Sequence, residues 1–129
     1  KMKIFEQEIE LRSLVGNRYS NLFGQYCSEE VITPYIHPKN NSVYAQYTIQ
    51  VSNRKKLIER LSECKIPTAV HYPIALNKQP AFLTEEFDVE ISTKVSEKVV
   101  SLPMHPYLSE TDQQKVVKKC TDIIKGKYK

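Results

Sequence analysis

The sequence predicts an α+β fold in which a small, mostly antiparallel sheet is flanked by helices. Three observations lead to this fold class. Residues 4–26 carry apolar side chains at three- and four-residue steps, residues 43–51 alternate apolar and less apolar side chains, and residues 66–70 suit a half-buried strand. With the shorter patterns between them, the predicted order is helix, strand, strand, helix, strand, loop, helix, short strand, helix.

Length and composition describe one ordinary globular domain. The chain has 129 residues and a mass of 15.0 kDa, with 40% hydrophobic and 26% charged residues. The N-terminus lacks the apolar stretch of a signal peptide, and no apolar run reaches the ~20 residues that cross a bilayer. Three cysteines, an odd number without a CxxC pair, indicate a reducing cytoplasm and no disulfide framework.

The first helix is predicted over residues 4–26. No helix start signal precedes it, and the chain opens inside the pattern on Lys1, which indicates a cut through a larger protein. Gly24 and the turn at residues 28–30 are expected to end the helix. Its apolar stripe is extended backwards by Ile4, Phe5 and Ile9 and consists of Leu11, Leu14, Val15, Tyr19, Leu22, Phe23 and Tyr26.

Two strand candidates follow this helix. Residues 31–37 suit an edge strand, because Pro34 cannot donate to a sheet ladder. A loop by composition then leads to SVYAQYTIQV at residues 42–51, the clearest strand in the chain. One face of this strand is apolar, and the other is mixed and carries Tyr44, Gln46, Thr48 and Gln50.

The second half of the chain alternates short helices and strands. Ser52 or Asn53 is expected to cap a helix that runs to about Cys64, and Ser92 or Thr93 a short helix that carries Val95 and Val99. Between these helices lie the strand candidate at 66–70 and a loop without a clear period at 76–88. A second apolar strand at 100–108 is broken by prolines. A capping-box variant at 109–112 then opens a last helix, which ends at Gly126.

Several kinds of active site are absent from this sequence pattern. Structural zinc sites need closely spaced ligand pairs, and no two Cys or His residues lie within a few positions of each other. No segment resembles a nucleophile elbow, and the three glycines are isolated, which excludes a glycine-rich phosphate loop. His37, His71 and His105 are equally spaced, but their flanking patterns differ, so the spacing is a coincidence and not a repeat.

The strand candidate at 66–70 ends in a pair of hydrogen-bonding rings. His71 and Tyr72 are followed by Pro73, which cannot donate to a ladder, and by a loop with a second proline after Gln79. Loops next to strand ends are common places for ligand contacts. From the periodicity alone, a histidine satisfied at the strand end and a half-buried core tyrosine are the favoured interpretations, and the proline and the following loop favour a site instead.

The segment around these rings resembles a known family. The run IPTAVHYPIALNKQPAF (66–82), followed by VVSLPMHPYLSETDQQKVV (99–117), resembles the C-terminal region of the DegT/DnrJ/StrS sugar aminotransferases, which are pyridoxal-phosphate enzymes of the type I fold. The helix ELRSLVGNRYSNLF (10–23) also resembles the interdomain helix of that family. This chain has Pro67 where the family usually has Gly, Ala75 where it has Pro, and Asn77 where it has His.

The resemblance implies a division of the chain and of the chemistry. Residues 1–27 would be a long interdomain helix and residues 28–129 the C-terminal small domain of a type I aminotransferase fold. The large domain with the Schiff-base lysine would precede Lys1, so the chain alone would bind no pyridoxal phosphate and carry no catalytic residue. The complete enzyme would be a cytoplasmic homodimer, with no nucleic acid or membrane as partner. The substrate-binding residues expected in this chain are His71, Tyr72 and Asn77.

The resemblance also suggests a substrate class. The chain looks closest to members that aminate UDP-2-acetamido-2-deoxy-3-oxoglucuronate for the O-antigen of lipopolysaccharide and related surface polysaccharides, and the family's usual amino donor is glutamate. Two other functions stay open at this point. One is a free-standing α+β module for RNA or another polyanion, supported by a net charge of +4, eight tyrosines and the mixed strand face. The other is a structural or dimerising fragment.

Overall fold

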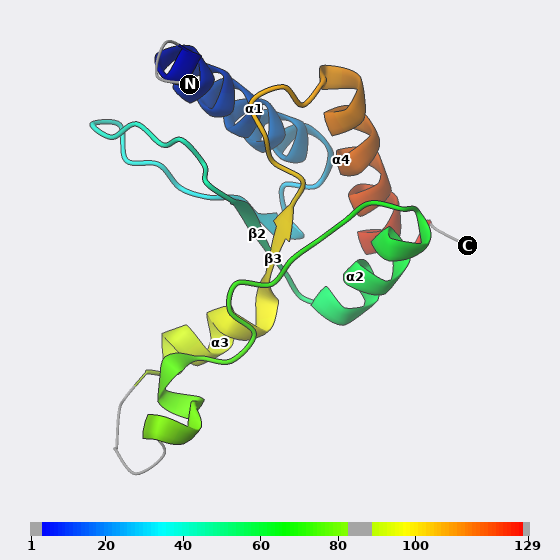
Figure 1. The fold of residues 1–129 in the computed structure, drawn as a ribbon. Helices are drawn as coiled ribbons and strands as arrows, with labels where there is room; N and C mark the ends of the chain where they lie inside the picture. The colour runs from blue at the N-terminus through cyan, green and yellow to red at the C-terminus, as the bar shows by residue number, and fades with distance from the viewer. Residues whose placement is uncertain (1–3, 83–88, 128–129) are drawn as a thin grey trace.

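The computed structural model describes residues 4–82 and 89–127, and within them it contains a three-stranded antiparallel sheet (Figure 1). The strands are β1 (Val31–Ile32), β2 (Tyr47–Val51) and β3 (Val99–Leu102), in the spatial order β1-β2-β3. Val31 lies opposite Val51, and Ile49 lies opposite Val100. The small antiparallel sheet of the predicted fold class is therefore confirmed.

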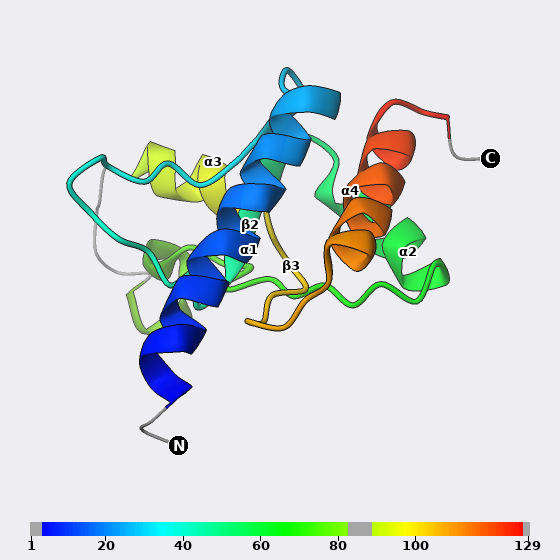
Figure 2. The same cartoon turned by 90° about the horizontal axis from the view of Figure 1, so that it is seen from above.

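Helices cover this sheet and supply most of the regular structure. They are α1 (Phe5–Tyr26), α2 (Arg54–Glu63), α3 (Glu90–Lys98) and α4 (Glu110–Ile124), with two short 3₁₀ turns, η2 (Leu76–Lys78) and η3 (Pro80–Phe82). Helices α4 and α2 lie on one side of α1 and β2, and α3 lies on the other (Figure 2). None of the described helices combines the length and the apolar character that a membrane crossing requires.

The core lies between the sheet and helices α1, α2 and α4. Tyr19 of α1 stacks on Tyr47 of β2 with ring centroids 4.8 Å apart, and both rings are fully buried. The Tyr19 hydroxyl donates to Pro103 O at 3.0 Å, and the hydroxyls of Ser20 and Tyr47 share a 2.8 Å hydrogen bond. Buried aromatic rings that satisfy their hydroxyls in this way fix the position of α1 on the sheet.

A buried amide joins α1 to α4. Gln113 is fully buried, its Nε2 donates to Val15 O at 2.8 Å, and its Oε1 accepts from Arg18 Nη1 at 3.0 Å. Both ends of the side chain are therefore paired, which removes most of the cost of burying it. The register between the two helices is fixed by specific contacts as well as by apolar packing.

Most predicted helix boundaries are confirmed. Asn53 caps α2 by accepting from Lys56 N at 3.2 Å, and the Ser109 hydroxyl oxygen accepts from Asp112 N at 3.1 Å at the start of α4. The predicted extent of the first helix is also confirmed, since α1 ends at Tyr26, just before the turn at residues 28–30. The helix passes through Gly24, because an exposed helical glycine costs only about 1 kcal/mol.

Of two further boundary predictions, the one for the C-terminus of α4 is confirmed and the one for the N-terminus of α3 is wrong. At the C-terminus of α4, Gly126 adopts φ +69°, its N–H donates to Ile123 O, and Lys127 N donates to Asp122 O, which is a Schellman motif. The predicted Ser92 or Thr93 cap of α3 is wrong. This helix begins at Glu90 with no side-chain cap, and Val99 belongs to β3.

All four predicted strands are shorter than expected. The candidate at 31–37 is a strand only over Val31–Ile32, the one at 42–51 only over Tyr47–Val51, and the one at 100–108 is replaced by Val99–Leu102. The segment 66–70 contributes a single antiparallel bridge, between Ala69 and Ser101. Alternation predicts which side chains are buried, but a strand also needs a partner along its whole length, and the short sheet limits that partner.

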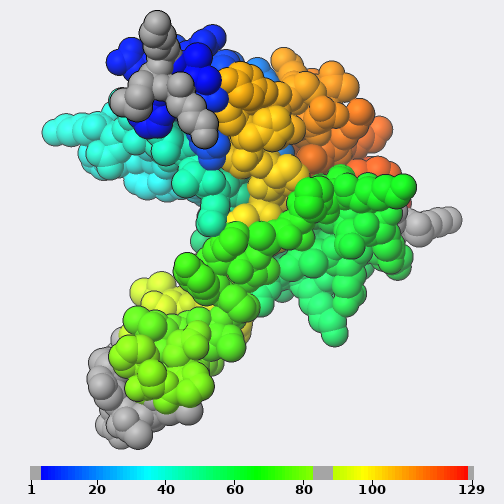
Figure 3. Space-filling view, in the orientation of Figure 1, coloured from blue at the N-terminus to red at the C-terminus, as the bar shows by residue number. Residues whose placement is uncertain are grey.

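An arm projects from this body. It consists of residues 74–82, which contain both 3₁₀ turns, and of α3 (Figures 1 and 3). Several large apolar side chains on or next to it are exposed, namely Tyr72, Ile74, Leu76 and Ile91. The arm shares little of the core with the body and begins directly after the predicted ring pair.

Candidate functional site

A helix end directs the chain toward the predicted ring pair. At the end of α2, Lys65 N donates to Ser62 O and Ile66 N donates to Leu61 O, each at 2.9 Å, which is again the Schellman pattern. The residue in the left-handed conformation is Lys65, with φ +58°. This turn sends residues 66–70 back across the sheet.

The segment is then held at the edge of β3. Ala69 N donates to Ser101 O at 3.1 Å, and Ser101 N donates to Ala69 O at 2.7 Å. The Ser101 hydroxyl in turn shares a 2.8 Å hydrogen bond with Thr48 on β2. His71 therefore leaves the body from a backbone that is fixed two residues earlier.

His71 lies at an open hollow of about 260 Å³ on the surface. The hollow is built from three segments that are far apart in the sequence, namely the approach to β2, the segment after α2, and β3 with the residues that follow it. Its wall is mainly apolar, with a few hydrogen-bonding side chains, as is common in sites for small molecules. The lining residues are Ala45, Gln46, Pro67, Thr68, Ala69, His71, Ser101, Leu102, Pro103 and Met104.

The structure brings His71 and Tyr72 together as an exposed pair. Their ring centroids lie 6.2 Å apart with an interplanar angle of 86°, which is an edge-to-face arrangement. His71 is exposed, Tyr72 is 78% exposed, and the peptide bond between them is cis. Tyr72 is therefore not the half-buried core aromatic that one interpretation of the sequence allowed.

Asn77 lies farther along, on η2 in the arm. It is half-buried, and its Oδ1 is buried without a hydrogen-bond partner within the described part of the chain. Such an amide oxygen can accept a hydrogen bond from a ligand or from another part of a protein. Neither Tyr72 nor Asn77 is among the described residues that line the hollow. The three predicted residues thus occupy one continuous surface segment but not one pocket.

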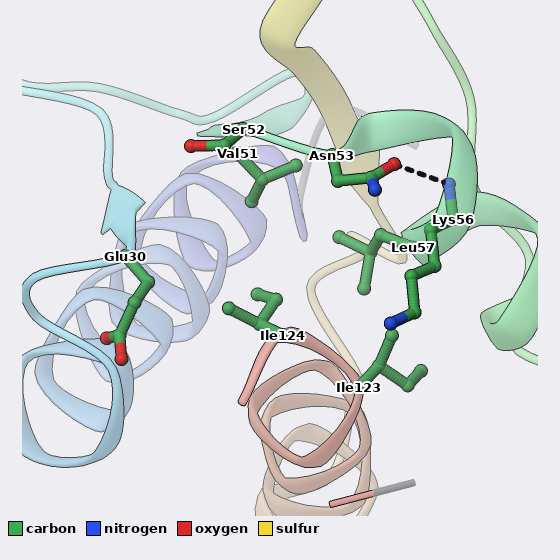
Figure 4. A pocket seen from close by; sticks show the side chains of 8 residues that line it. All are labelled: Glu30, Val51, Ser52, Asn53, Lys56, Leu57, Ile123 and Ile124. Atoms are coloured by element: carbon green, nitrogen blue, oxygen red, sulfur yellow. Dashed lines mark hydrogen bonds between the residues drawn. The ribbon is translucent and has the colours of Figure 1, made fainter. Parts of the chain in front are cut away.

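A second pocket, of about 250 Å³, lies between β2, α2 and α4 (Figure 4). Its floor is aliphatic, from Val51, Leu57 and Ile123, with Glu30 at one side and Lys56 at the other. Lys125 Nζ lies 3.8 Å from Glu30 Oε1, so the positive charge of the lysine partly offsets the negative charge of the carboxylate. This pocket contains none of the predicted site residues.

The groups with strongly altered acidity lie in the core and not in the hollow. Burial raises the pKa of Cys120 to about 12 and that of Cys27 to about 11. Burial also raises the pKa of Tyr19 and Tyr47. Because these groups are inaccessible, their shifts reflect packing and not catalysis. Within residues 4–82 and 89–127, no cluster of three His, Cys, Asp or Glu side chains could hold a metal ion.

The lysines bear on whether this part of the chain could hold pyridoxal phosphate. A lysine that forms a Schiff base needs surroundings in which its amine becomes neutral, and burial provides them. Every lysine that the structure describes is exposed or only partly buried. The described residues that line the hollow beside His71 include no lysine. What they offer is hydrogen bonding and ring faces at the hollow.

One predicted binding surface is wrong. The face with Tyr44, Gln46 and Thr48, which supported RNA binding, is not a continuous strand face, because only Thr48 of the three lies in β2. Tyr44 is buried against Gly16 on α1, outside β2, and its hydroxyl donates to Asn17 at 3.1 Å. A ring packed in this way cannot stack on a base.

The hollow contains residues that the sequence did not single out. Gln46, Thr68 and Ser101 come from three separate segments, and only the tertiary structure brings them to His71. The sequence pattern predicts Ser101 and Pro103 as parts of a strand and Gln46 as part of a mixed strand face. The sequence marks Gln46, Thr68 and Ser101 only as polar residues close to the end of a predicted strand. Many ordinary surface residues share that feature, so it does not identify a binding site.

Comparisons with known proteins agree with the fold. Residues 1–121 match the DegT/DnrJ/EryC1/StrS aminotransferase family, whose members are pyridoxal-phosphate-dependent aminotransferases. The solved structure of a DegT DnrJ EryC1 StrS aminotransferase from Brucella abortus superposes with a TM-score of 0.84 at 31% identity, over 95% of this chain and 33% of that one. The architecture is thus that of the C-terminal part of a type I aminotransferase fold, as predicted.

Two curated relatives are similar in sequence. The UDP-2-acetamido-2-deoxy-3-oxo-D-glucuronate aminotransferase of Pseudomonas aeruginosa is 46% identical over 108 residues, which are 84% of this chain and 29% of that protein. The dTDP-3-amino-3,6-dideoxy-alpha-D-galactopyranose transaminase of Aneurinibacillus thermoaerophilus is 31% identical over 98 residues, 71% of this chain and 27% of that protein. The chain therefore spans less than a third of the length of these two relatives. It belongs to the DegT/DnrJ/EryC1/StrS aminotransferase family.

Proposed function

We propose that this chain is the small domain of a pyridoxal-phosphate enzyme that transfers an amino group to a UDP-linked 3-oxo sugar. The support is family membership and 46% identity to a relative named for such a substrate. Glutamate is the proposed donor, and the aminated sugar would enter a surface polysaccharide such as the O-antigen of lipopolysaccharide. The complete enzyme would act in the cytoplasm.

The proposal divides the work between this chain and the rest of the enzyme. Pyridoxal phosphate, when bound, supplies an electron sink for the transfer. The lysine and the phosphate-binding groups that hold it would lie in a larger N-terminal domain, joined to this one through the interdomain helix at residues 1–27. The active site would be completed at the interface of a homodimer. The residues of this chain would bind and orient the sugar nucleotide.

The observation that supports this role is the exposed ring pair, of which His71 lines the hollow and Tyr72 follows it directly in the chain. Tyr72 is a large ring that is 78% exposed, and His71 lies edge-on to it at 6.2 Å. An imidazole and a phenol can donate to or accept from sugar hydroxyls and phosphate while their faces cover the sugar ring. The unpartnered Asn77 Oδ1 adds an acceptor on the same segment. Their task is positioning and not proton transfer.

The reaction itself is the first test. Purified full-length protein is incubated with pyridoxal phosphate, glutamate and a UDP-2-acetamido-2-deoxy-3-oxo sugar, and the aminated product is followed by mass spectrometry. We expect the absorbance band of bound cofactor and glutamate-dependent formation of a UDP-amino sugar. Absence of cofactor absorbance would overturn the assignment as an aminotransferase. Cofactor binding with turnover of dTDP-linked but not UDP-linked sugars would overturn only the substrate.

A further inference from the structure

A single arginine on α1 holds the segment that leads into the hollow. Arg12 Nε donates to Val43 O at 2.8 Å, and Arg12 Nη2 donates to Tyr44 O at 2.7 Å and to Ala45 O at 3.1 Å. These three carbonyls precede β2 and take no part in the strand pairing described for it. The planar fork of a guanidinium can satisfy several acceptors at once, which an ammonium group cannot reproduce in the same geometry.

The same helix fixes this segment from two further positions. Ser13 Oγ donates to Ser42 O at 2.8 Å. The Tyr44 ring packs against α1 at Gly16, where an added Cβ would lie 2.3 Å from the ring. Tyr44 itself has φ +41°, a conformation that a residue with a side chain adopts only when its surroundings fix it. Residues 42–45 are therefore held to α1 by their backbone and by one buried ring.

The held segment forms part of the wall of the hollow. Ala45 and Gln46 line it together with His71, and Tyr47, the next residue, is fixed by its stack on Tyr19 and its hydrogen bond to Ser20. Both sides of the Ala45–Gln46 pair are thus anchored on α1. The ring pair has its own anchor, the bridge between Ala69 and Ser101. The width of the hollow depends on these two anchors together.

We infer that Arg12 is a positioning residue for the sugar-nucleotide site, because it fixes Ala45 and the backbone that leads to Gln46, which line the same hollow as His71. Gly16 has the same role, since only a residue without a side chain admits the Tyr44 ring. This inference rests on the proposed function, because it takes the hollow beside His71 to be part of the sugar site. Arg12 itself is not among the described residues that line the hollow.

The test compares variants of the full-length protein in two measurements. The first is hydrogen–deuterium exchange of peptides that cover residues 42–46, and the second is steady-state kinetics with the UDP-sugar. Arg12→Met is the main variant and Arg12→Lys the conservative one. Gly16→Ala moves Tyr44 without weakening the helix, because alanine favours a helix over glycine. Arg18→Met is the matched control, since Arg18 is on the same helix and bonds Gln113 on α4 instead.

We expect Arg12→Met and Gly16→Ala to raise exchange in residues 42–46 and to raise KM for the sugar about tenfold, with kcat changing much less. Arg12→Lys should fall between Arg12→Met and the unaltered protein, and Arg18→Met should leave both readouts for this segment unchanged. Faster exchange with an unaltered KM would make the Arg12 contacts purely structural and overturn the inference. An unaltered KM in His71→Ala, measured in parallel, would instead overturn the proposed function.

Discussion

Lys65 occupies a backbone position that favours glycine, and this yields a stability prediction. Helices α2 and α4 end in the same Schellman hydrogen-bond pattern. The left-handed residue is Lys65 (φ +58°) in one and Gly126 (φ +69°) in the other. The two ends therefore serve as matched sites, one with the favoured residue and one without it.

The size of the effect follows from two opposing terms. The left-handed conformation costs a residue with a Cβ roughly 1–2 kcal/mol. Glycine loses roughly 0.4–1 kcal/mol more conformational entropy on folding than alanine does. Lys65→Gly should therefore raise the free energy of unfolding by about 0.5–1 kcal/mol, and Gly126→Ala should lower it by about as much. Apart from the chain neighbours of Gly126, no described residue has an atom within 4 Å of a Cβ built there, so crowding within residues 4–82 and 89–127 does not add to that loss.

Urea unfolding of the 129-residue chain, followed by circular dichroism, measures both changes as shifts in midpoint at constant slope. Lys65→Ala is the control, because it removes the charge and keeps the strained conformation. It should remain within about 0.5 kcal/mol of the unaltered chain. If Lys65→Gly and Lys65→Ala have the same stability, the conformational argument is refuted and the charge of Lys65 explains any change.

Three further predictions concern the core. Burial raises the pKa of Cys120 to about 12 from the 9.0 of an ordinary thiol. Alkylation at pH 8 should therefore be at least about a thousandfold slower at Cys120 than at a thiol with the ordinary pKa. Rapid labelling of Cys120 in the native state would contradict its burial. A raised thiol pKa means that the native state holds more protons than the unfolded state between about pH 9 and 12. Stability should therefore fall as pH rises through that window, and an unchanged urea midpoint there would contradict this. Gln113→Leu should cost about 1–2 kcal/mol in urea unfolding through its two lost hydrogen bonds, and a neutral effect would mean that the buried amide does not stabilise the α1–α4 contact.

The helices could be predicted from the sequence because their signals are local. Asn53 and Ser109 each cap a helix through an N–H three residues away, and the apolar stripe of α1 is readable within a few turns. Even in α1, the apolar stripe predicts more buried side chains than the structure has, since Leu14 and Tyr26 are more than half exposed. Whether an apolar helical residue finds a partner depends on elements elsewhere in the chain.

The strands and the hollow could be predicted only in part because they depend on long-range partners. Val43 and Ala45 continue the alternation of β2, yet their carbonyls bond Arg12, which lies more than thirty residues earlier in the sequence. The ring pair was recognised from a proline and from motif resemblance, both local features. Gln46 and Ser101 join His71 only through the packing of three segments, so no local pattern could indicate them.

The central claim is that His71 and Tyr72 contact the sugar nucleotide, and binding measures this most directly. Calorimetric titration of a UDP-N-acetyl sugar into the cofactor-loaded full-length protein compares His71→Ala and Tyr72→Ala with His37→Ala and Tyr35→Ala, which alter an exposed histidine and a tyrosine that is 81% exposed. We predict that the two ring-pair variants weaken sugar binding about tenfold or more while cofactor absorbance stays unchanged. Equal affinity in all four variants, or loss of cofactor with unchanged sugar affinity, would contradict the account.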